Sequence, residues 1–245
     1  MTLREIYTLL DGISPFELQE AWDNSGLLIG SPDDTFDHVV VALDIDEQML
    51  DEVEEKSLII THHPLIFGKL NRLDFSHYPA KFIQKMIKKD IFHIALHTNF
   101  DKTHLNRYVA ENVLNLDNIE ADDFVCYGDI PEQSLESFAL EIKTKLGLDK
   151  IKYTKAGGTV RRVALTTGSG ASLLKHINAD CFLTGDIKYH DAMEALAINI
   201  SLIDITHYGS ERFFSQILCE ILKHNGIKAI IKNSKDPFTI MQEIK

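Results

Sequence analysis

The chain has 245 residues, of which 44% are hydrophobic, and its formal net charge is −12. This length and apolar content suit one large α/β domain or two small lobes with their own cores, and they exclude a disordered chain. An acidic surface repels a phosphate backbone, which argues against duplex nucleic acid as a partner.

The sequence also lacks the usual marks of membrane or secreted proteins. No stretch approaches the roughly 20 apolar residues of a membrane span, and the first six residues do not have the layout of a signal peptide. The three cysteines, Cys126, Cys181 and Cys219, are too far apart for a CxxC zinc motif and too few for a disulfide framework. We therefore expect a cytoplasmic protein with no membrane partner.

The predicted elements begin with a helix and a short strand. Ser14-Pro15-Phe16-Glu17 has the pattern of a helix capping box with proline at the first helical position, and Leu27–Gly30 has the pattern of a strand. Short apolar runs then alternate with amphipathic helical segments, which is typical of a mostly parallel sheet covered by helices on both faces. The expected strands are His38–Asp44, Leu58–Thr61, Phe92–Leu96, Val163–Thr167, Cys181–Thr184 and Leu202–Thr206, and the expected helices between them include Glu47–Lys56, Pro79–Lys89 and Leu105–Leu114.

The order of the elements occurs twice along the chain. The second pass begins with a helix near Ser134–Leu146 and a strand at Ile151–Thr154, and three strand–helix units follow. We therefore predict two α/β repeats, residues 1–126 and 127–245. They are expected to pack tightly, since no Pro-, Gly- or Ser-rich linker separates them. The alternative is that any α/β chain looks repetitive at this level.

Polar side chains follow four of the predicted strands at the point where each strand ends. Because the carboxyl ends of strands in an open parallel sheet border the ligand crevice, we expect these groups on one side of the molecule. In chain order they are His62 and His63, then His97 and Asp101, then Asp186, and finally His207 and Glu211.

Five of these side chains form a candidate metal-ligand set: His62, His63, Asp101, His207 and Glu211. Neighbouring residues on an extended backbone point in opposite directions, so the two adjacent histidines can serve two metals. His207 and Glu211, four residues apart at a helix start, form a chelating pair. Each signal has an ordinary alternative: an incidental histidine pair, a capping aspartate, or a glutamate that suits the helix dipole.

Together these residues supply three imidazoles and two carboxylates. This set suits zinc, iron, manganese or nickel, and it is too rich in nitrogen for calcium or magnesium alone. Five ligands also exceed one closed tetrahedral zinc site. Two divalent ions that share a carboxylate fit better, and a pair about 3.5–4 Å apart can lower the pKa of a water molecule for hydrolysis.

The remaining motifs have two readings each. Asp186 and His190, four residues apart, would share a helical face and orient a ligand or move a proton, but a capping aspartate with a packed histidine is equally consistent. His97 is open to the same two readings. Gly168-Ser169-Gly170 follows a strand and could bind a phosphate, although an ordinary turn explains it better. Asp23-Asn24-Ser25-Gly26 is typical of a turn, and no role follows for it.

Five ordered motifs resemble those of the NIF-three-like dinuclear metal-centre family, whose members are often named GTP cyclohydrolase I type 2 homologues. The resemblance covers essentially the whole chain. It rests on Trp22-Asp23-Asn24-Ser25-Gly26-Leu27-Leu28-Ile29-Gly30, Thr61-His62-His63-Pro64-Leu65-Ile66-Phe67, His97-Thr98-Asn99-Phe100-Asp101, Thr184-Gly185-Asp186-Ile187-Lys188-Tyr189-His190-Asp191-Ala192 and His207-Tyr208-Gly209-Ser210-Glu211.

This resemblance implies the same five ligands, with Asp101 and Glu211 bridging two metals. It also implies two intertwined α/β repeats and a toroidal homohexamer with the sites facing its interior. The chain is too short for the inserted middle domain of longer relatives. It has Thr167-Gly168-Ser169-Gly170 where relatives show a richer glycine loop.

These expectations favour a metal-dependent hydrolase acting on a small molecule. The resemblance implies a nucleotide substrate and a ring opening like that of a GTP cyclohydrolase. Three alternatives stay open: a metallophosphoesterase, a non-catalytic protein that stores or delivers metal, and a regulatory protein whose metals are structural.

Overall fold

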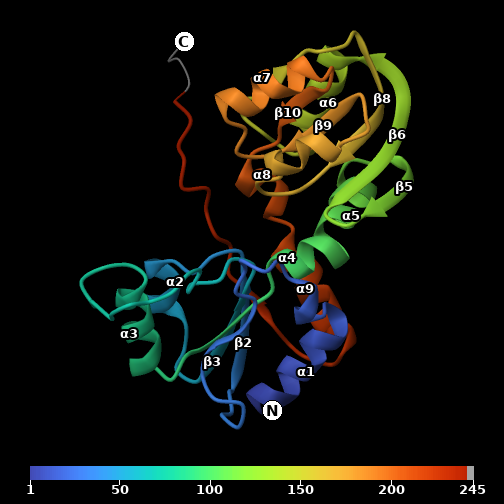
Figure 1. The fold of residues 1–245 in the computed structure, drawn as a ribbon. Coiled ribbons are helices and arrows are strands. Elements are labelled where there is room, and N and C mark those ends of the chain that lie inside the picture. The colour runs from blue at the N-terminus through green and yellow to red at the C-terminus, as the bar shows by residue number, and fades with distance from the viewer. Residues whose placement is uncertain (242–245) are drawn as a thin grey trace. The chain divides into compact units, whose positions relative to one another are not determined.

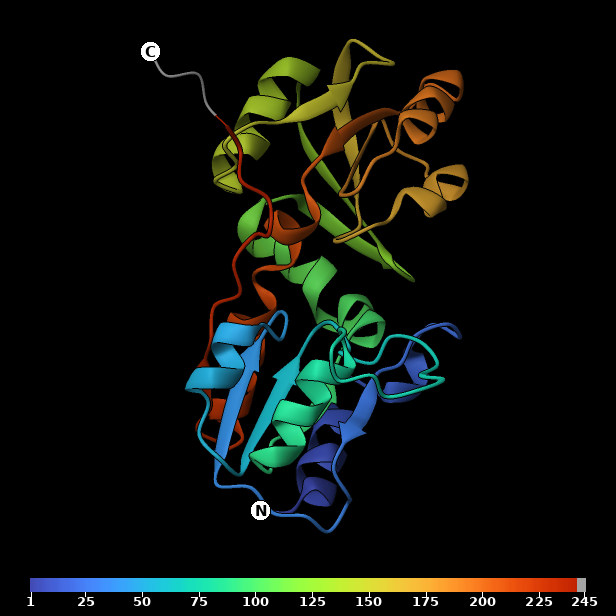
Figure 2. The ribbon, with the colours of Figure 1, turned by 90° about the vertical axis from the view of Figure 1, so that its left-hand side faces the viewer.

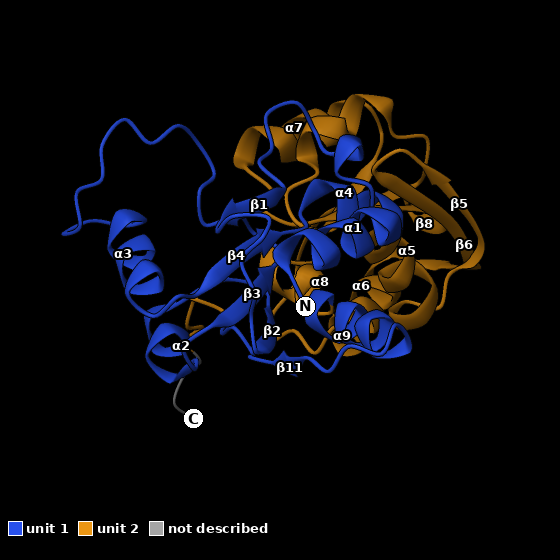
Figure 3. Cartoon of the chain, turned by 90° about the horizontal axis from the view of Figure 1, so that it is seen from below, with its two compact units in different colours: residues 1–103, 214–235 blue, residues 104–213, 236–245 orange. Residues whose placement is uncertain are grey.

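The computed structural model describes residues 1–241 and divides into two compact units (Figure 3). Unit 1 comprises Met1–Thr103 and Phe214–Lys235, and unit 2 comprises His104–Phe213 and the segment that starts at Asp236. Unit 1 is therefore assembled from two pieces of chain, one on each side of residues 104–213 in the sequence. The expected division into repeats 1–126 and 127–245 concerns the order of elements, and it stays a prediction.

Unit 1 is a five-stranded sheet with helices on both faces. Its strand order is β1-β4-β3-β2-β11, and every neighbouring pair is parallel except β1 with β4. Its elements are α1 (Leu3–Ile13), η1 (Phe16–Leu18), β1 (Gly26–Ile29), β2 (His38–Ala42), α2 (Glu47–Glu52), β3 (Ser57–Thr61), α3 (Ala80–Lys88), β4 (Phe92–Ala95), α4 (Thr98–Phe100), α9 (Phe214–His224) and β11 (Ile230–Ile231).

The helices of unit 1 cover the two faces of its sheet. Figures 1 and 2 show α2 and α3 on one face and α1 and α9 on the other. The first of these layers is a continuous apolar core in which Val40 and Ile59 of the strands pack with Leu50 of α2 and Met86 of α3. The strand interiors are buried on both sides, which explains their unbroken β-branched runs.

The N-terminal helix begins earlier than its predicted cap. Glu5 N donates to the side chain of Thr2 and Thr2 N donates to the carboxylate of Glu5, so the capping box lies at the start of α1. The capping box predicted at Ser14 is wrong, because Phe16–Leu18 forms only a single 3₁₀ turn and the Ser14 hydroxyl bonds to that of Thr103.

Unit 2 is a six-stranded mixed sheet in the order β5-β6-β8-β9-β10-β7. The turn η2 (Asp101–Leu105), which is π-helical, crosses the boundary between the units in the sequence. The other elements are α5 (Asn106–Tyr108), η3 (Val109–Val113), β5 (Asp117–Asp122), β6 (Val125–Ser134), α6 (Leu135–Lys145), β7 (Lys152–Thr154), β8 (Thr159–Leu165), η4 (Ala171–His176), β9 (Cys181–Thr184), α7 (Tyr189–Ala197), β10 (Ser201–Asp204) and α8 (His207–Glu211).

The centre of this sheet is parallel and its edges are antiparallel. β8, β9 and β10 run in one direction, whereas β5, β6 and β7 join by antiparallel pairing. α7 and η4 cover one face through an apolar core that includes Phe182 and Leu202, and α6 packs on the other face against β6 and β8. Figure 2 shows α6 and α7 on opposite sides of these strands.

The predicted α/β class is thus confirmed, with two mixed sheets covered by helices. All six expected strands exist as β2, β3, β4, β8, β9 and β10. The hairpin of β5 and β6 is the main element that the sequence patterns did not predict. No helix in residues 1–241 is long and apolar enough to cross a lipid bilayer.

Candidate metal site

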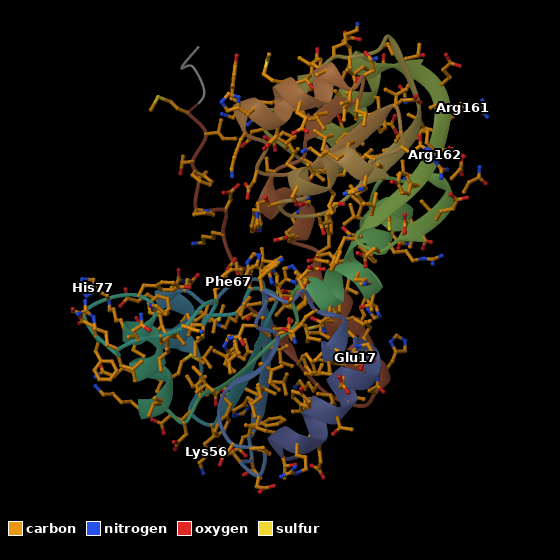
Figure 4. The ribbon with its side chains drawn as sticks, viewed as in Figure 1. Glu17, Lys56, Phe67, His77, Arg161 and Arg162 are labelled. Carbon is orange, nitrogen blue, oxygen red and sulfur yellow. The ribbon has the colours of Figure 1, made fainter. Side chains whose placement is uncertain are left out.

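In unit 1, histidines gather at the carboxyl ends of β3 and β4. These strands and β2 are parallel neighbours, so their ends meet at one edge of the sheet. The ligand nitrogens of His62, His63 and His97 lie within 4.8 Å of one another. Asp101 lies one helical turn after His97, and its Oδ1 is 3.3 Å from Nε2 of His62. We call these four residues the unit 1 cluster. Figure 4 labels Lys56, just before β3, and Phe67, which follows His62 and His63 in the sequence.

Each of the three histidines donates its Nδ1–H to a fixed acceptor. A carbonyl or carboxylate oxygen can only accept, so Nδ1 carries a proton and Nε2 is the ring nitrogen that a cation could bind. A ring held in this way is oriented to bind a cation through Nε2. The three bonds are His62 to the Leu96 carbonyl (2.9 Å), His63 to Asp44 (2.7 Å) and His97 to Asp23 (2.8 Å).

The turn at Asp23 positions the His97 end of the cluster. The fully buried carboxylate of Asp23 accepts hydrogen bonds from His97 Nδ1, from the backbone and hydroxyl of Thr98 and from the hydroxyl of Ser25. Burial alone would raise the pKa of Asp23, but the hydrogen bond and charge of His97, helped by Thr98, lower it well below the usual range. The carboxylate therefore stays ionised. Asp23 and Asp44 each accept a hydrogen bond from a clustered histidine, a contact that the sequence patterns did not predict for either residue.

Unit 2 repeats the arrangement with one histidine. Nδ1 of His207 donates to Asp186, which follows β9, at 2.7 Å. Nε2 of His207 lies 3.0 Å from Oε2 of Glu211, one turn later on α8. The bond to Glu211 is the main cause that raises the pKa of His207 to about 9, with Asp186 adding to it and burial opposing it. The predicted chelating pair is therefore in contact, and Asp186 orients its ring. We call these three residues the unit 2 cluster.

The glycine loop after β8 makes room for Glu211. Gly168 has φ +63°, and a Cβ there would lie 2.1 Å from Oε1 of Glu211. Its N–H donates to the Ser210 hydroxyl at 3.0 Å, and the N–H of Gly170 donates to the Thr184 hydroxyl at 2.7 Å. Because these two N–H groups bind side chains of unit 2, the loop is better explained as a close-packed turn than as a phosphate cradle.

The backbone around His207 is strained. Thr206 has φ +59° and ψ 151°, a conformation that a β-branched residue rarely adopts, and Asp186 has φ +54°. Such residues cost about 1–3 kcal/mol each and persist where the surrounding structure imposes them. A Cβ on Gly185 would lie 2.7 Å from the backbone nitrogen of His207, so the two segments are packed together closely. The strain is therefore stored at the point where His207 and Asp186 meet.

His190 lies apart from the arrangement predicted for it. α7 begins at Tyr189, so Asp186 precedes the helix and the two residues do not share a helical face. His190 is exposed in the first turn, where its ring lies edge-on to that of Tyr189, 5.3 Å away. The carboxylate of Asp186 is bonded to His207 instead.

The spacing of donor atoms fits divalent metal ions. Two ligands bound about 2.1 Å from one tetrahedral ion lie roughly 3.4 Å apart. The pair of His62 and Asp101 is separated by 3.3 Å, and the pair of His207 and Glu211 by 3.0 Å. Imidazole nitrogens combined with carboxylate oxygens suit zinc, iron, manganese and nickel. The described residues of unit 1 thus include a group that could hold a metal ion, and unit 2 contributes a His–Glu pair with suitable spacing.

Comparison with known proteins identifies relatives along the whole chain. The family model of Duf34/NIF3 (NGG1p interacting factor 3) matches residues 1–237. A Campylobacter jejuni protein named GTP cyclohydrolase 1 type 2 homolog is 47% identical over 239 residues, which cover 97% of this chain and 99% of that protein. A Helicobacter pylori protein named GTP cyclohydrolase 1 type 2 is 40% identical over 240 residues, covering 98% and 99% of the two chains.

The fold is shared with solved structures. The crystal structure of the Staphylococcus aureus protein SA1388 matches with a TM-score of 0.86 and 28% sequence identity. The match covers 98% of this chain and 99% of that chain. The same two-sheet α/β architecture is therefore present in a protein of lower sequence similarity.

Proposed function

We propose that this chain, which belongs to the Duf34/NIF3 family, binds two divalent metal ions and uses them to hydrolyse a nucleotide. One observation carries the proposal. Four histidines, three in unit 1 and one in unit 2, give their Nδ1–H groups to fixed acceptors and keep Nε2 for a cation. Exposed His224 also gives its Nδ1–H to a carbonyl, so the support gains its meaning from a second feature: in each unit one of these rings has Nε2 only 3.0 or 3.3 Å from a carboxylate oxygen.

We assign the metal ligands to His62, His63 and Asp101 of unit 1 and to His207 and Glu211 of unit 2. The support is chemical: in each unit an Nε2 lies 3.0 or 3.3 Å from a carboxylate oxygen. Asp101 and Glu211 are the proposed bridging carboxylates, since each has two oxygens to share. His97 has the same ring support as the other histidines of unit 1, and it either completes a metal site or hydrogen-bonds the substrate.

When bound, the two ions would polarise the substrate and lower the pKa of water, which is the chemistry that hydrolysis needs at neutral pH. The residues of this chain position the groups that would bind the ions. Asp23, Asp44 and Asp186 hold the imidazole rings in orientation and keep their Nδ1 atoms protonated. Because the Helicobacter and Campylobacter relatives are named for GTP cyclohydrolase, we propose a purine nucleotide as substrate and opening of a ring C–N bond as the reaction.

The metal content of the purified protein tests the first part of the proposal. Protein prepared without added metal is expected to contain about two ions per chain by elemental analysis. Asp101→Ala should lose at least one of them, because it removes a proposed bridging oxygen. Asp33→Ala is the matched control, since the Asp33 side chain is 86% exposed and forms a surface ion pair with Arg4. A metal content below half an ion per chain in the unaltered protein would contradict the proposal.

Product analysis tests the second part. Metal-reconstituted protein incubated with GTP is expected to give a ring-opened nucleotide, at a rate well above that of Asp101→Ala. Release of phosphate or pyrophosphate with an intact base would instead identify a metallophosphoesterase. Tight metal binding with no product, and with transfer of ions to an acceptor, would indicate storage or delivery. Unfolding on chelation without any turnover would indicate structural metals.

We also propose a cytoplasmic homohexamer, on the basis of the family resemblance. Analytical ultracentrifugation should give a mass six times that of the 27.8 kDa chain. Cell fractionation should find the protein with cytoplasmic markers. A monomer at micromolar concentration, or a membrane-bound fraction, would contradict these two proposals.

A further inference from the structure

Two exposed aromatic side chains lie beside the unit 1 cluster. Trp22 is 58% exposed and Phe67 is 53% exposed. Their ring centroids are 5.8 Å apart, and each centroid lies 6.0 Å from that of His97. The imidazole meets both rings edge-on, at 74° and 70°. Large exposed aromatic rings that adjoin one another and a polar cluster mark binding surfaces more often than bare solvent-facing positions.

Hydrogen bonds hold this aromatic pair in place. Nδ2 of Asn24 donates to the carbonyl of Ile66 at 2.6 Å, which ties the segment that carries Trp22 to the loop that carries Phe67. Asp23, between Trp22 and Asn24, accepts the Nδ1–H of His97. The two rings are therefore fixed relative to His97 by their own neighbours in the sequence. This assigns a role to the Asp23-Asn24 turn, for which the sequence alone gave none.

We propose that Trp22 and Phe67 form a stacking platform for the planar heterocycle of the substrate and hold that ring next to the unit 1 cluster. This inference rests on the proposed function, and it adds the residues that select the substrate class. Aromatic faces prefer offset stacking on other flat rings, and a base has such a face whichever atoms it carries. The platform therefore selects a flat aromatic ring, not a sugar or a phosphate chain.

The composition of the chain provides a direct probe. Trp22 is the single tryptophan, so tryptophan fluorescence reports on the platform alone. Zinc-loaded protein is titrated with GTP, with guanosine and with inorganic triphosphate. GTP and guanosine should quench the emission in a saturable way, whereas triphosphate should leave it unchanged, since it has no ring to stack.

Two pairs of variants separate stacking from structural damage. Phe67→Ala should weaken GTP binding about tenfold, because stacking on one aromatic ring contributes about that factor. Phe75→Ala removes another exposed aromatic ring from the same loop, 43% exposed, and should change binding less than twofold. By equilibrium dialysis, Trp22→Ala should weaken GTP binding about tenfold, whereas Trp22→Phe should keep it within a few-fold. All four variants should retain the metal content of the unaltered protein.

The outcomes distinguish this inference from the proposed function. If two ions are bound but GTP does not quench Trp22, or if Phe67→Ala behaves like Phe75→Ala, the platform is wrong and the metal site stands. If acrylamide cannot reach Trp22 in protein without nucleotide, another copy of the chain covers the rings, and the platform is also wrong. If the unaltered protein binds no metal while GTP still quenches Trp22, the platform stands and the hydrolase fails.

Discussion

The unit 1 and unit 2 clusters use the same support for histidine but differ in charge. In unit 1, three rings share two carboxylates and one neutral carbonyl as Nδ1 acceptors. In unit 2, the single ring of His207 lies between two carboxylates, which raise its pKa to about 9. The comparison shows that rings with the same Nδ1 support can lie in surroundings of different charge, and that the two carboxylates keep His207 protonated until a metal displaces its proton.

A substitution in the glycine loop should break the unit 2 cluster and have the largest effect. Gly168→Ala places a Cβ where Glu211 lies and forces alanine into a left-handed conformation. We expect a loss of about 3 kcal/mol in the free energy of unfolding by urea, together with loss of metal from this cluster. Gly158→Ala is the control, because nothing lies within 4 Å of its added Cβ. Equal stability of the two variants would contradict the packing argument.

The protonation of His207 should make metal affinity depend on pH. The metal-free ring is protonated below about pH 9, and a metal must displace that proton, so affinity should rise with pH up to that value. Between pH 7 and pH 9 we expect an increase of roughly 100-fold in manganese affinity, measured by chelator competition. Asp186→Asn removes one of the carboxylates and should move the rise to lower pH. A flat profile in both proteins would show that His207 is not a ligand.

A buried histidine in unit 1 provides a contrast to the protonated ring of His207 in unit 2. His93 of β4 is fully buried, and burial lowers its pKa to about 3. The folded protein keeps this ring neutral while the unfolded chain takes up a proton below about pH 6.5, so stability is lost as pH falls. When the pH falls from 7 to 5, the free energy of unfolding should decrease in both proteins. We expect this decrease to be about 2 kcal/mol smaller in His93→Phe than in the unaltered protein.

The control for this experiment is an exposed histidine. Figure 4 shows His77 in the loop between β3 and α3, away from the sheet. His77→Phe should leave the pH dependence of urea unfolding unchanged. Identical profiles for His93→Phe and the unaltered protein would contradict the assignment of His93 as a neutral buried ring.

Substitution of Asp23, the carboxylate that supports His97, should have the smallest of the four predicted effects. Asp23→Asn removes the charge but leaves an amide oxygen that can still accept the Nδ1–H. We expect metal affinity to fall about tenfold, at the low end of the range for such supporting residues. Zinc competition measures this change, with Asp33→Asn as the exposed control. An affinity equal to that of the control would mean that the unit 1 cluster does not need Asp23.

The sequence patterns predicted the elements better than their ends. Six buried strands were found because their apolar runs persist over several residues. The capping box was placed at Ser14, since Thr2 and Ser14 both begin the same four-residue pattern and only the longer helix after Thr2 uses it. The β5–β6 hairpin was missed because the exposed strand β5 has almost no apolar residues to mark it.

The candidate ligands were found by their position after strands, but their partners were not. His62, His63 and His97 end strands that are neighbours in one parallel sheet, and strand ends can be located from the chain alone. The Nδ1 acceptors could not be located from the chain alone, because they are far from the histidines in the sequence. Asp44 is 19 residues from His63, and Asp23 is 74 residues from His97. No local pattern relates residues at such separations.

The sequence by itself determined which side chains could bind a cation and on which strand ends they stand, because periodicity and spacing are local properties. Only the tertiary structure decided which nitrogen of each ring is available to a cation, why Gly168 must lack a side chain, and where Trp22 meets Phe67. These features depend on strand register and on contacts between distant segments. They exist only when the folded chain brings those segments within hydrogen-bond or van der Waals distance.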